Sequence, residues 1–165
     1  MKFTTRSISR SAVIAALYVL LTFVFQAISF GAVQFRVSEA MMLLPLISLD
    51  AVPGLFIGCL LANILGGAVW FDVLLGALAS LLAALAVYRL KKHPLIAAAM
   101  PALFNGLIVG PVVYFAYVRA PGAAISYPVL FSSMASVAVG EIAVCYVLGL
   151  LMIRALRRIP EDRLR

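Results

Sequence analysis

Few ionisable side chains lie inside the apolar stretches of this sequence, and these few are the first candidates for chemistry. Glu141 stands near the middle of one long apolar stretch, and the amide Asn105 stands near the middle of another. Polar groups of this kind are costly in a membrane and usually serve a function there. Other carboxylates, amides and aromatic rings fall near the ends of such stretches. Together they form a candidate ligand-binding set: Gln34, Arg36, Glu39, Asn63, Trp70, Asp72, Asn105, Tyr114 and Glu141.

The chemistry offered by this set is recognition of a small molecule. An aromatic ring stacks on a flat ligand, and a carboxylate accepts hydrogen bonds from two adjacent N–H groups. A guanine-type heterocycle suits both, and a primary amine on it would suit a second carboxylate. The sequence contains no P-loop, HExxH or GxSxG motif, and its single histidine, His93, lies in a basic loop. Since Cys59 and Cys145 lack metal-ligand spacing, we predict no catalytic residue, no cofactor and no metal site.

Each member of the set also has a structural interpretation. Arg36 and Glu39 are able to pair with each other at a membrane interface. Trp70 and Tyr117 suit an interfacial aromatic belt. Hydrogen bonds that cap a helix or join two helices would account for three others: Asp72, Asn63 and Asn105. Glu141 is the hardest to explain in this way, because a carboxylate in the middle of a membrane helix needs a partner.

The composition indicates the solvent that surrounds the chain. Of 165 residues, 65% are hydrophobic and 12% are charged, and the mean hydropathy is +1.16. A soluble domain of this size needs more polar residues to cover its surface. We therefore expect an all-α, polytopic membrane protein. The net charge of +7 is clustered at particular places, whereas nucleic-acid binding calls for Lys and Arg along one face among aromatic residues.

The breaks between apolar stretches divide the chain into helices. A membrane-crossing helix takes about 20 mostly apolar residues, and charges, Pro and Gly mark the breaks. We predict one membrane domain, residues 1–165, with six transmembrane helices. The expected spans are approximately 11–30, 37–50, 53–67, 71–89, 94–118 and 127–156. The second, which contains Pro45, is expected to be short or tilted.

The distribution of charge predicts the orientation of these six spans. Both termini fall on one side, together with eleven of the 13 Lys and Arg residues, while Arg36 and Arg119 fall on the other. The positive-inside rule then predicts a plasma-membrane protein with cytoplasmic termini. The candidate set falls in the outer half or at the midplane, which indicates a cup open to the outside with Asn105 and Glu141 at its floor. A channel or a proton relay would need polar residues through the inner half as well.

Small residues recur at four-residue spacing, a pattern typical of close helix contacts in membranes. Two stripes of this kind are Gly54, Gly58, Ala62, Gly66 and Ala98, Ala102, Gly106, Gly110. A shorter pair on the first helix, Ala12 and Ala16, has two interpretations. It packs within the chain, or it docks a second membrane protein.

Several segments together resemble a known family. They are residues 33–40 (VQFRVSEA), 58–63 (GCLLAN), 71–76 (FDVLLG) and 104–110 (FNGLIVG), with 139–141 (VGE) in the last span. They resemble the queuosine-precursor transporter family, QueT, over about residues 6–156. The run around Arg36 and Glu39 is the most specific part. Members of this family are substrate-binding (S) components of energy-coupling factor (ECF) transporters.

The resemblance implies an ECF S-component-like fold that captures a 7-deazaguanine from outside: the aminomethyl or cyano form, or queuine. It also implies partners, namely a transmembrane coupling subunit and two cytoplasmic ATPases, with Ala12 and Ala16 matching the docking motif. A loop at 31–36 would close over the ligand. In this hypothesis Glu141 and Asn105 read the polar edge of the heterocycle. The other proposed roles are stacking by Trp70 or Tyr114, contact with a ligand amine by Asp72, and closure of the mouth by Gln34, Arg36 and Glu39.

Two other functions remain open at this point. One is a stand-alone secondary carrier coupled to protons through Glu141, which would transport its ligand without ATPase partners. The other is a membrane assembly protein without a small ligand. In that case no purine-like compound would raise its melting temperature, because only binding to the folded state stabilises it.

Overall fold

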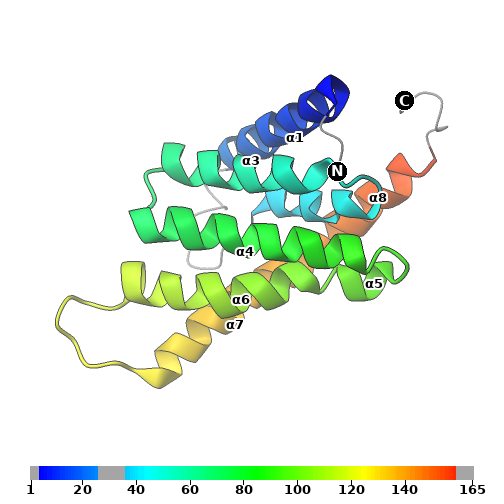
Figure 1. Cartoon of the computed structure of the whole chain (residues 1–165). Helices are drawn as coiled ribbons and strands as arrows, with labels where there is room; N and C mark the ends of the chain where they lie inside the picture. The colour runs from blue at the N-terminus through cyan, green and yellow to red at the C-terminus, as the bar shows by residue number, and fades with distance from the viewer. Residues whose placement is uncertain (1–3, 26–35, 159–165) are drawn as a thin grey trace.

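The structure is a computed structural model that describes residues 4–25 and 36–158. Within these residues the chain forms helices and their connections, with no strand. The elements are α1 (Thr5–Val24), η1 (Val37–Leu46), α3 (Ala51–Leu65), α4 (Trp70–Arg89), α5 (Pro94–Ala97), α6 (Met100–Val113), η2 (Tyr114–Val118), α7 (Tyr127–Ala143), η3 (Val144–Gly149) and α8 (Leu150–Leu156). The predicted all-α class is confirmed (Figure 1).

The lengths and surfaces of the helices are those of a polytopic membrane protein. Four helical stretches are long and apolar enough to cross a membrane: Thr5–Val24, Trp70–Arg89, Pro94–Val118 and Tyr127–Leu156. Two shorter apolar helices, Val37–Leu46 and Ala51–Leu65, accompany them. Large apolar side chains such as Leu74, Leu107 and Leu151 are exposed on the outside of the bundle. This surface suits lipid and confirms the predicted membrane class.

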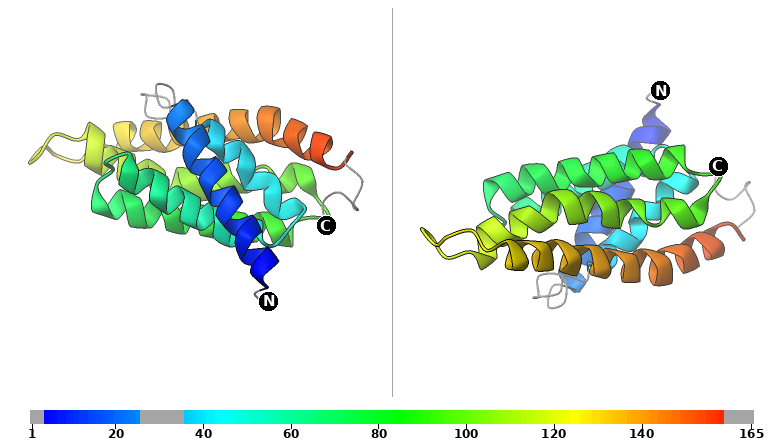
Figure 2. Two further views of the ribbon diagram at one scale, coloured as in Figure 1. Left: turned by 90° about the horizontal axis from the view of Figure 1, so that it is seen from above. Right: turned by 90° about the horizontal axis from the view of Figure 1, so that it is seen from below.

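Two ends of the elongated bundle are distinguished in Figure 1. The start of α1, the α4–α5 connection and the end of α8 lie toward one end, which we call the terminal end. The α3–α4 and η2–α7 connections lie toward the other, which we call the far end. Figure 2 shows the same arrangement, with α1 crossing the face of the other helices obliquely.

The start of α1 differs from the expected span because the helix extends beyond its apolar part. Thr4 caps the helix, and its hydroxyl oxygen accepts a hydrogen bond from the Ser7 backbone N–H at 3.2 Å. At this end α1 is tied to the turn before α3. The Ser7 hydroxyl donates to Asp50 Oδ1 at 2.5 Å, and Arg10 Nη1 lies 3.5 Å from Asp50 Oδ2. Polar residues therefore continue the helix where it leaves the apolar region.

The short second helix, η1, lies at the centre of the bundle. It is a 3₁₀ helix with Pro45 inside it, and eight of its ten residues are buried. A 3₁₀ helix rises about 2.0 Å per residue, so ten residues span about 20 Å, compared with about 15 Å for an α-helix. The tighter winding lets this short segment reach further through the bundle, and it brings Glu39 toward the neighbouring helices.

The expected span 94–118 is interrupted in the structure. Helix α5 ends at Ala97, and α6 begins at Met100 with Pro101 in its first turn. Pro101 has no backbone N–H to donate to the Ala97 carbonyl four residues earlier, which favours a break here. Wider π-helical turns, η2 and η3, continue α6 and α7.

Close approach of the backbones holds neighbouring helices together. A Cβ added at Gly54 of α3 would lie 2.6 Å from the Ser11 backbone oxygen of α1. A Cβ added at Gly110 of α6 would lie 2.6 Å from Met134 Cα of α7. Both distances are too short for any side chain. The two small-residue stripes therefore contribute contact faces, as predicted.

Candidate binding site

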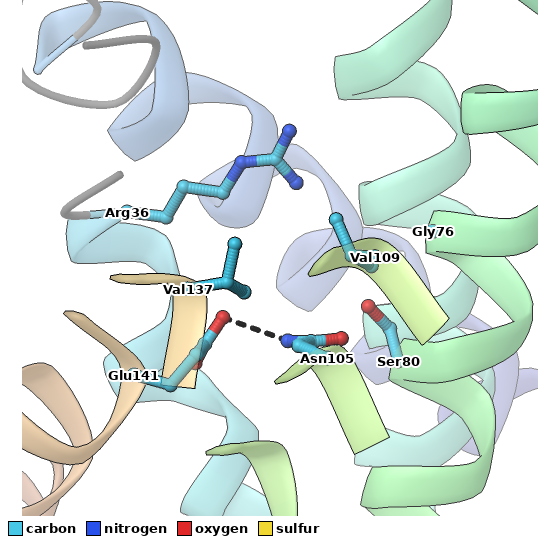
Figure 3. A pocket seen from close by; sticks show the side chains of 7 residues that line it. All are labelled: Arg36, Gly76, Ser80, Asn105, Val109, Val137 and Glu141. Atoms are coloured by element: carbon cyan, nitrogen blue, oxygen red, sulfur yellow. Dashed lines mark hydrogen bonds between the residues drawn. The ribbon is translucent and has the colours of Figure 1, made fainter. Parts of the chain in front are cut away.

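A small polar cavity lies where η1, α4, α6 and α7 meet, about midway along the bundle. Its volume is about 10 Å³, close to the space that one water molecule needs. It is lined by Arg36, Gly76, Ser80, Asn105, Val109, Val137 and Glu141 (Figure 3). Three members of the candidate set, Arg36, Asn105 and Glu141, are thus brought together from three different segments of the chain.

The Glu141–Asn105 pair joins α7 to α6 at this cavity. Asn105 Nδ2 donates to Glu141 Oε1 at 2.7 Å, and both side chains are buried. Because the amide nitrogen faces the carboxylate, the amide oxygen is turned away from it, and Figure 3 shows that oxygen directed toward Ser80. The hydrogen bond between helices and the lining of the cavity are therefore two roles of the same residues.

Arg36 reaches the cavity from the start of η1 and connects it to α3. Its Nη2 donates to Asn63 Oδ1 at 3.0 Å. Asn63 is fully buried beside Gly76 of α4, where an added Cβ would lie 2.9 Å from Asn63 Nδ2. The absence of a side chain at position 76 thus leaves room for both the Asn63 amide and the cavity.

Asp72 lies one turn before Gly76 and is also buried. The Tyr117 hydroxyl donates to Asp72 Oδ2 at 2.8 Å, which joins α4 to η2. Asp72 Oδ1 lies 3.6 Å from the position of a Cβ on Gly76. Helix α4 begins after Val69, with no side-chain hydrogen bond at its cap, so the Asp72 carboxylate binds Tyr117 instead of capping the helix.

Glu39 is buried deeper in the same region and pairs with α1. The Tyr18 hydroxyl donates to Glu39 Oε1, and the Thr22 and Ser38 hydroxyls are hydrogen-bonded at 2.8 Å beside it. Arg36 interacts electrostatically with Glu39, Asp72 and Glu141. The Arg36 guanidinium is therefore within electrostatic range of three carboxyl groups, while its Nη2 is hydrogen-bonded to Asn63.

Four buried carboxyl and amide groups around the cavity each have an oxygen atom without a hydrogen-bond donor in the described residues. Four of their oxygens have no hydrogen-bond partner within residues 4–25 and 36–158: Glu39 Oε2, Asp72 Oδ1, Asn105 Oδ1 and Glu141 Oε2. Each is a hydrogen-bond acceptor that the pairings described above leave unused. A buried acceptor without a donor costs about 1–3 kcal/mol. The arrangement is thus suited to a ligand that brings several donors. The same part of the chain contains no group of three or more His, Cys, Asp and Glu side chains that could hold a metal ion.

Three members of the candidate set are not placed in the cavity by the described residues. Gln34 and most of the predicted closing loop, 31–36, lie outside the described residues. Trp70 is 74% exposed and packs edge-on against Phe71. Tyr114 is buried, but its hydroxyl accepts from the Ser126 backbone N–H at 2.7 Å and it does not line the cavity. Stacking by either ring stays a prediction.

Four polar or small residues at or beside the site were missed from the sequence, as were the cavity-lining Val109 and Val137. Ser80 and Gly76 line the cavity, whereas Tyr18 and Tyr117 hold Glu39 and Asp72. One signal was available: positions 72, 76 and 80 recur every four residues, which places them on one face of a helix. Tyr18 has a weaker signal, as one of several polar or small residues on the buried face of α1: Ser7, Ser11, Ala15, Tyr18 and Thr22.

The opposite face of α1 carries Ala12 and Ala16. Both are exposed, together with Val13 and Leu17. The buried face of the helix supplies the contacts to α3, since Gly58 packs against Ala15 and Tyr18. The pair therefore does not pack within the described part of the chain.

The fold and the site define a multi-pass helical membrane protein with a buried, acceptor-rich polar site. The chain belongs to the QueT transporter family, which matches it over residues 8–158, and the resemblance seen in the sequence is thereby confirmed. A curated relative, the queuosine precursor transporter QueT of Lactococcus lactis subsp. cremoris (strain MG1363), is 39% identical over 82 residues. The aligned part spans about half the length of each protein, 48% of this chain and 48% of the relative. No solved structure matches the chain significantly.

Proposed function

We propose that this protein is the membrane-embedded substrate-capture subunit of an ATP-driven importer for a queuosine precursor. The observation that carries the proposal is the Glu141–Asn105 pair, whose unpartnered oxygens face a polar cavity inside a QueT-family bundle. A 7-deazaguanine presents adjacent N–H groups along its pyrimidine edge. Glu141 Oε2 and Asn105 Oδ1 are acceptors for that edge, and Arg36 is a donor for its carbonyl oxygen.

Binding of such a heterocycle requires the site to open. A cavity of about 10 Å³ holds about one water molecule, whereas the ligand is a bicyclic ring system. Arg36, Val109 and Val137 line the cavity together with the Glu141–Asn105 pair, so their side chains or helices must move apart. Their displacement on binding would couple the site to the arrangement of η1, α6 and α7.

The orientation that we propose places both termini in the cytoplasm. In the described part of the chain, the cations at the terminal end are Arg6, Arg10, Arg89, Lys91, Lys92, Arg154, Arg157 and Arg158. Of the other two, Arg119 lies in the η2–α7 connection at the far end, and Arg36 precedes η1 and lines the cavity. The positive-inside rule assigns the first group to the cytoplasm. The site is then reached from outside, as capture for import requires.

Energy for transport is supplied in this proposal by a transmembrane coupling subunit and two cytoplasmic ATPases. Ala12 and Ala16 are small, exposed and one helical turn apart near the terminal end of α1. Small residues at this spacing let a second helix approach closely within the membrane. They form the proposed docking face for the coupling subunit.

Binding to the purified chain tests the proposed function. A 7-deazaguanine is expected to co-purify with the protein or to raise its melting temperature, and to lose this effect in Glu141→Ala. In liposomes, uptake is expected to need the coupling subunit and the ATPases. Transport by the chain alone would favour a secondary carrier, and a lack of binding by every purine-like compound would favour an assembly protein.

Replacement of both small residues tests the docking face separately. Ala12→Leu with Ala16→Leu is expected to abolish association with the coupling subunit and to leave ligand binding intact. Leu74, exposed on α4, offers a control in Leu74→Ala, which should change neither property. Loss of folding in the double variant would instead show that the pair supports the bundle itself.

A further inference from the structure

The lining of the cavity has an apolar part that the proposed hydrogen bonds do not use. Among the described residues its apolar side chains are Val109 of α6 and Val137 of α7, which are buried in one apolar cluster with Ala79. Val109 follows Asn105 by four residues, and Val137 precedes Glu141 by four residues. Because α6 and α7 run in opposite directions, both valines lie about 6 Å nearer the far end than the polar pair, at about 1.5 Å per residue. The valines therefore form a layer next to the pair (Figure 3).

The two valines are held at a fixed spacing by the helices that carry them. A Cβ added at Gly106 of α6 would lie 3.1 Å from Ala138 Cβ of α7, and one added at Gly110 would lie 2.6 Å from Met134 Cα. The backbones of α6 and α7 are thus in contact beside the valines. A valine side chain is also stiff, because its branched Cβ restricts χ1. We therefore expect ligand entry to part this pair of helices from η1 or α4 and to leave the two valines together.

A flat heterocycle that binds by its edge needs an apolar surface for its face. With its pyrimidine edge at the Glu141–Asn105 pair, the rest of the ring system extends toward the far end and lies alongside the valine layer. No aromatic side chain lines the cavity in the described part of the chain, since Trp70 is exposed and Tyr114 does not reach it. The methyl groups of two neighbouring valines offer the face a close contact, because dispersion attraction requires only that atoms touch.

We propose that Val109 and Val137 form the surface on which the face of the heterocycle rests, and that this surface makes the site selective for a planar ring. The inference rests on the proposed function and adds the ring-face contact to it. A planar ring touches both valines at once. Saturated carbons carry hydrogen atoms above and below the ring plane, which hold the ring away from the surface. A gap of about 0.5–1 Å already forfeits about a quarter to a half of the attraction between two atoms.

Calorimetry on the detergent-purified full-length chain tests this inference with 7-deazaguanine and its 7,8-dihydro derivative, which has the same pyrimidine edge. The planar compound is expected to bind at least about tenfold more tightly, the order of discrimination that a misfit of one methylene gives in an apolar pocket. Equal or tighter binding of the dihydro compound would overturn the inference and leave the proposed function standing. No binding by either compound would overturn both, because the proposed recognition of the edge needs nothing that 7-deazaguanine lacks.

Variants locate the surface that contacts the ring. Val109→Ala and Val137→Ala are each expected to weaken binding of 7-deazaguanine about tenfold and to narrow the planar preference to within about threefold. Val112, buried on α6 but outside the lining, provides the matched control in Val112→Ala, which should keep the wild-type affinity and preference.

The preference for the planar ligand separates contact with the ring from a general loss of packing, which would weaken both compounds alike. An unchanged preference in both valine variants, while Glu141→Ala still loses binding, would overturn the assignment to the valines and leave the proposed function standing. If one alanine variant fails to fold, the other variant and the comparison of ligands on the wild-type chain still decide.

Discussion

The buried side chains change in character between the far half and the terminal half of the bundle. Toward the far end and midway along the helices, the structure buries Glu39, Asn63, Asp72, Asn105 and Glu141. Toward the terminal end it buries a cluster of apolar residues: Leu43, Leu46, Val87, Ala97, Ala98 and Ile153. Helices η1 and α4 contribute to both halves, so the same helix buries polar side chains in one half and apolar side chains in the other.

This difference is the one that the proposed capture of a ligand from one side requires. Within lipid, apolar residues gain little by hiding from the solvent, so packing holds the terminal half together. A tightly packed apolar floor offers no path for a polar ligand, while the acceptor-rich half above it offers a site. In the proposed function, such a molecule would capture a ligand without conducting it and would depend on partners for transport.

The largest loss of stability is expected when a charged residue replaces an apolar one in the terminal half. Leu43 of η1 is fully buried in the apolar cluster. Leu43→Asp places a carboxylate there without a partner, at a cost of about 3–4 kcal/mol on membrane-insertion scales. We expect little folded protein in size-exclusion chromatography, whereas Leu43→Met, similar in volume, should fold normally. Normal yield and melting temperature for Leu43→Asp would show that the floor is not a dry apolar layer.

The next largest effect, a loss of ligand affinity, is expected from a substitution in the polar half. Glu141→Ala removes the acceptor of the Asn105 amide and one wall of the cavity. We expect deazaguanine affinity to fall about 100-fold, or about 2.7 kcal/mol, as measured by calorimetry.

Glu141→Gln separates shape from charge at this position. Its amide oxygen still accepts from Asn105, so the melting temperature should stay close to that of the wild type while affinity falls. Wild-type affinity in both variants would place the binding site elsewhere in the chain.

These two halves were not equally predictable from the sequence. Glu141 and Asn105 stood out because a polar residue in a long apolar stretch is costly wherever the helix faces. The division into a cytoplasmic and an outer side was predicted by counting charges, and it stays a prediction. By contrast, the pairing of Tyr18 with Glu39 depends on how α1 is rotated against η1, and the polar and small residues on one face of α1 give only a weak sign of that rotation.

Other features of the structure could not be predicted, because one residue type is compatible with more than one structural role. Gly76 and Gly110 look alike in the sequence, but one lines the cavity and the other only permits contact with α7. The sequence predicted a short or tilted helix at η1, and it gave no sign that this helix would be a 3₁₀ helix. Aromatic residues near a span end suit both an interfacial belt and a binding site, so Trp70 and Tyr114 could not be assigned in advance.

A link between α1 and the polar half is expected to have an intermediate effect. Tyr18→Phe removes the hydroxyl that donates to Glu39 and leaves that buried carboxylate with one partner fewer. The loss is expected to be about 2 kcal/mol of stability, as for a hydrogen bond to a charged group, measured as a lower melting temperature. Thr22→Val, at a neighbouring position on the same buried face, changes a neutral hydroxyl pair and should cost less. A smaller loss in Tyr18→Phe than in Thr22→Val would argue against the importance of the Tyr18–Glu39 contact.

A small change in the wall of the cavity is expected to weaken ligand binding, by a smaller free energy than the changes above. Gly76→Ala adds a Cβ that would lie 2.9 Å from Asn63 Nδ2 and would displace the amide that holds Arg36. We expect about tenfold weaker binding, or about 1.4 kcal/mol, in a protein that still folds. Ala77→Ser, at the next position and also buried but away from the lining, is the control. Unchanged affinity in Gly76→Ala would show that the Asn63 side of the cavity does not contact the ligand.

The smallest effect is expected at Trp70, which sharpens the boundary of the polar half. The residue begins α4 only two positions before Asp72, yet its ring is 74% exposed and packs on Phe71 outside the cavity. A ring in this position suits the membrane interface. Trp70→Ala is therefore expected to change ligand affinity by less than about threefold, or about 0.7 kcal/mol, while Trp fluorescence of the wild type should respond little to ligand. A large loss of affinity together with strong quenching would mean that α4 turns or the site opens far enough for the ring to stack on the heterocycle. The polar half would then extend to the far end of the bundle.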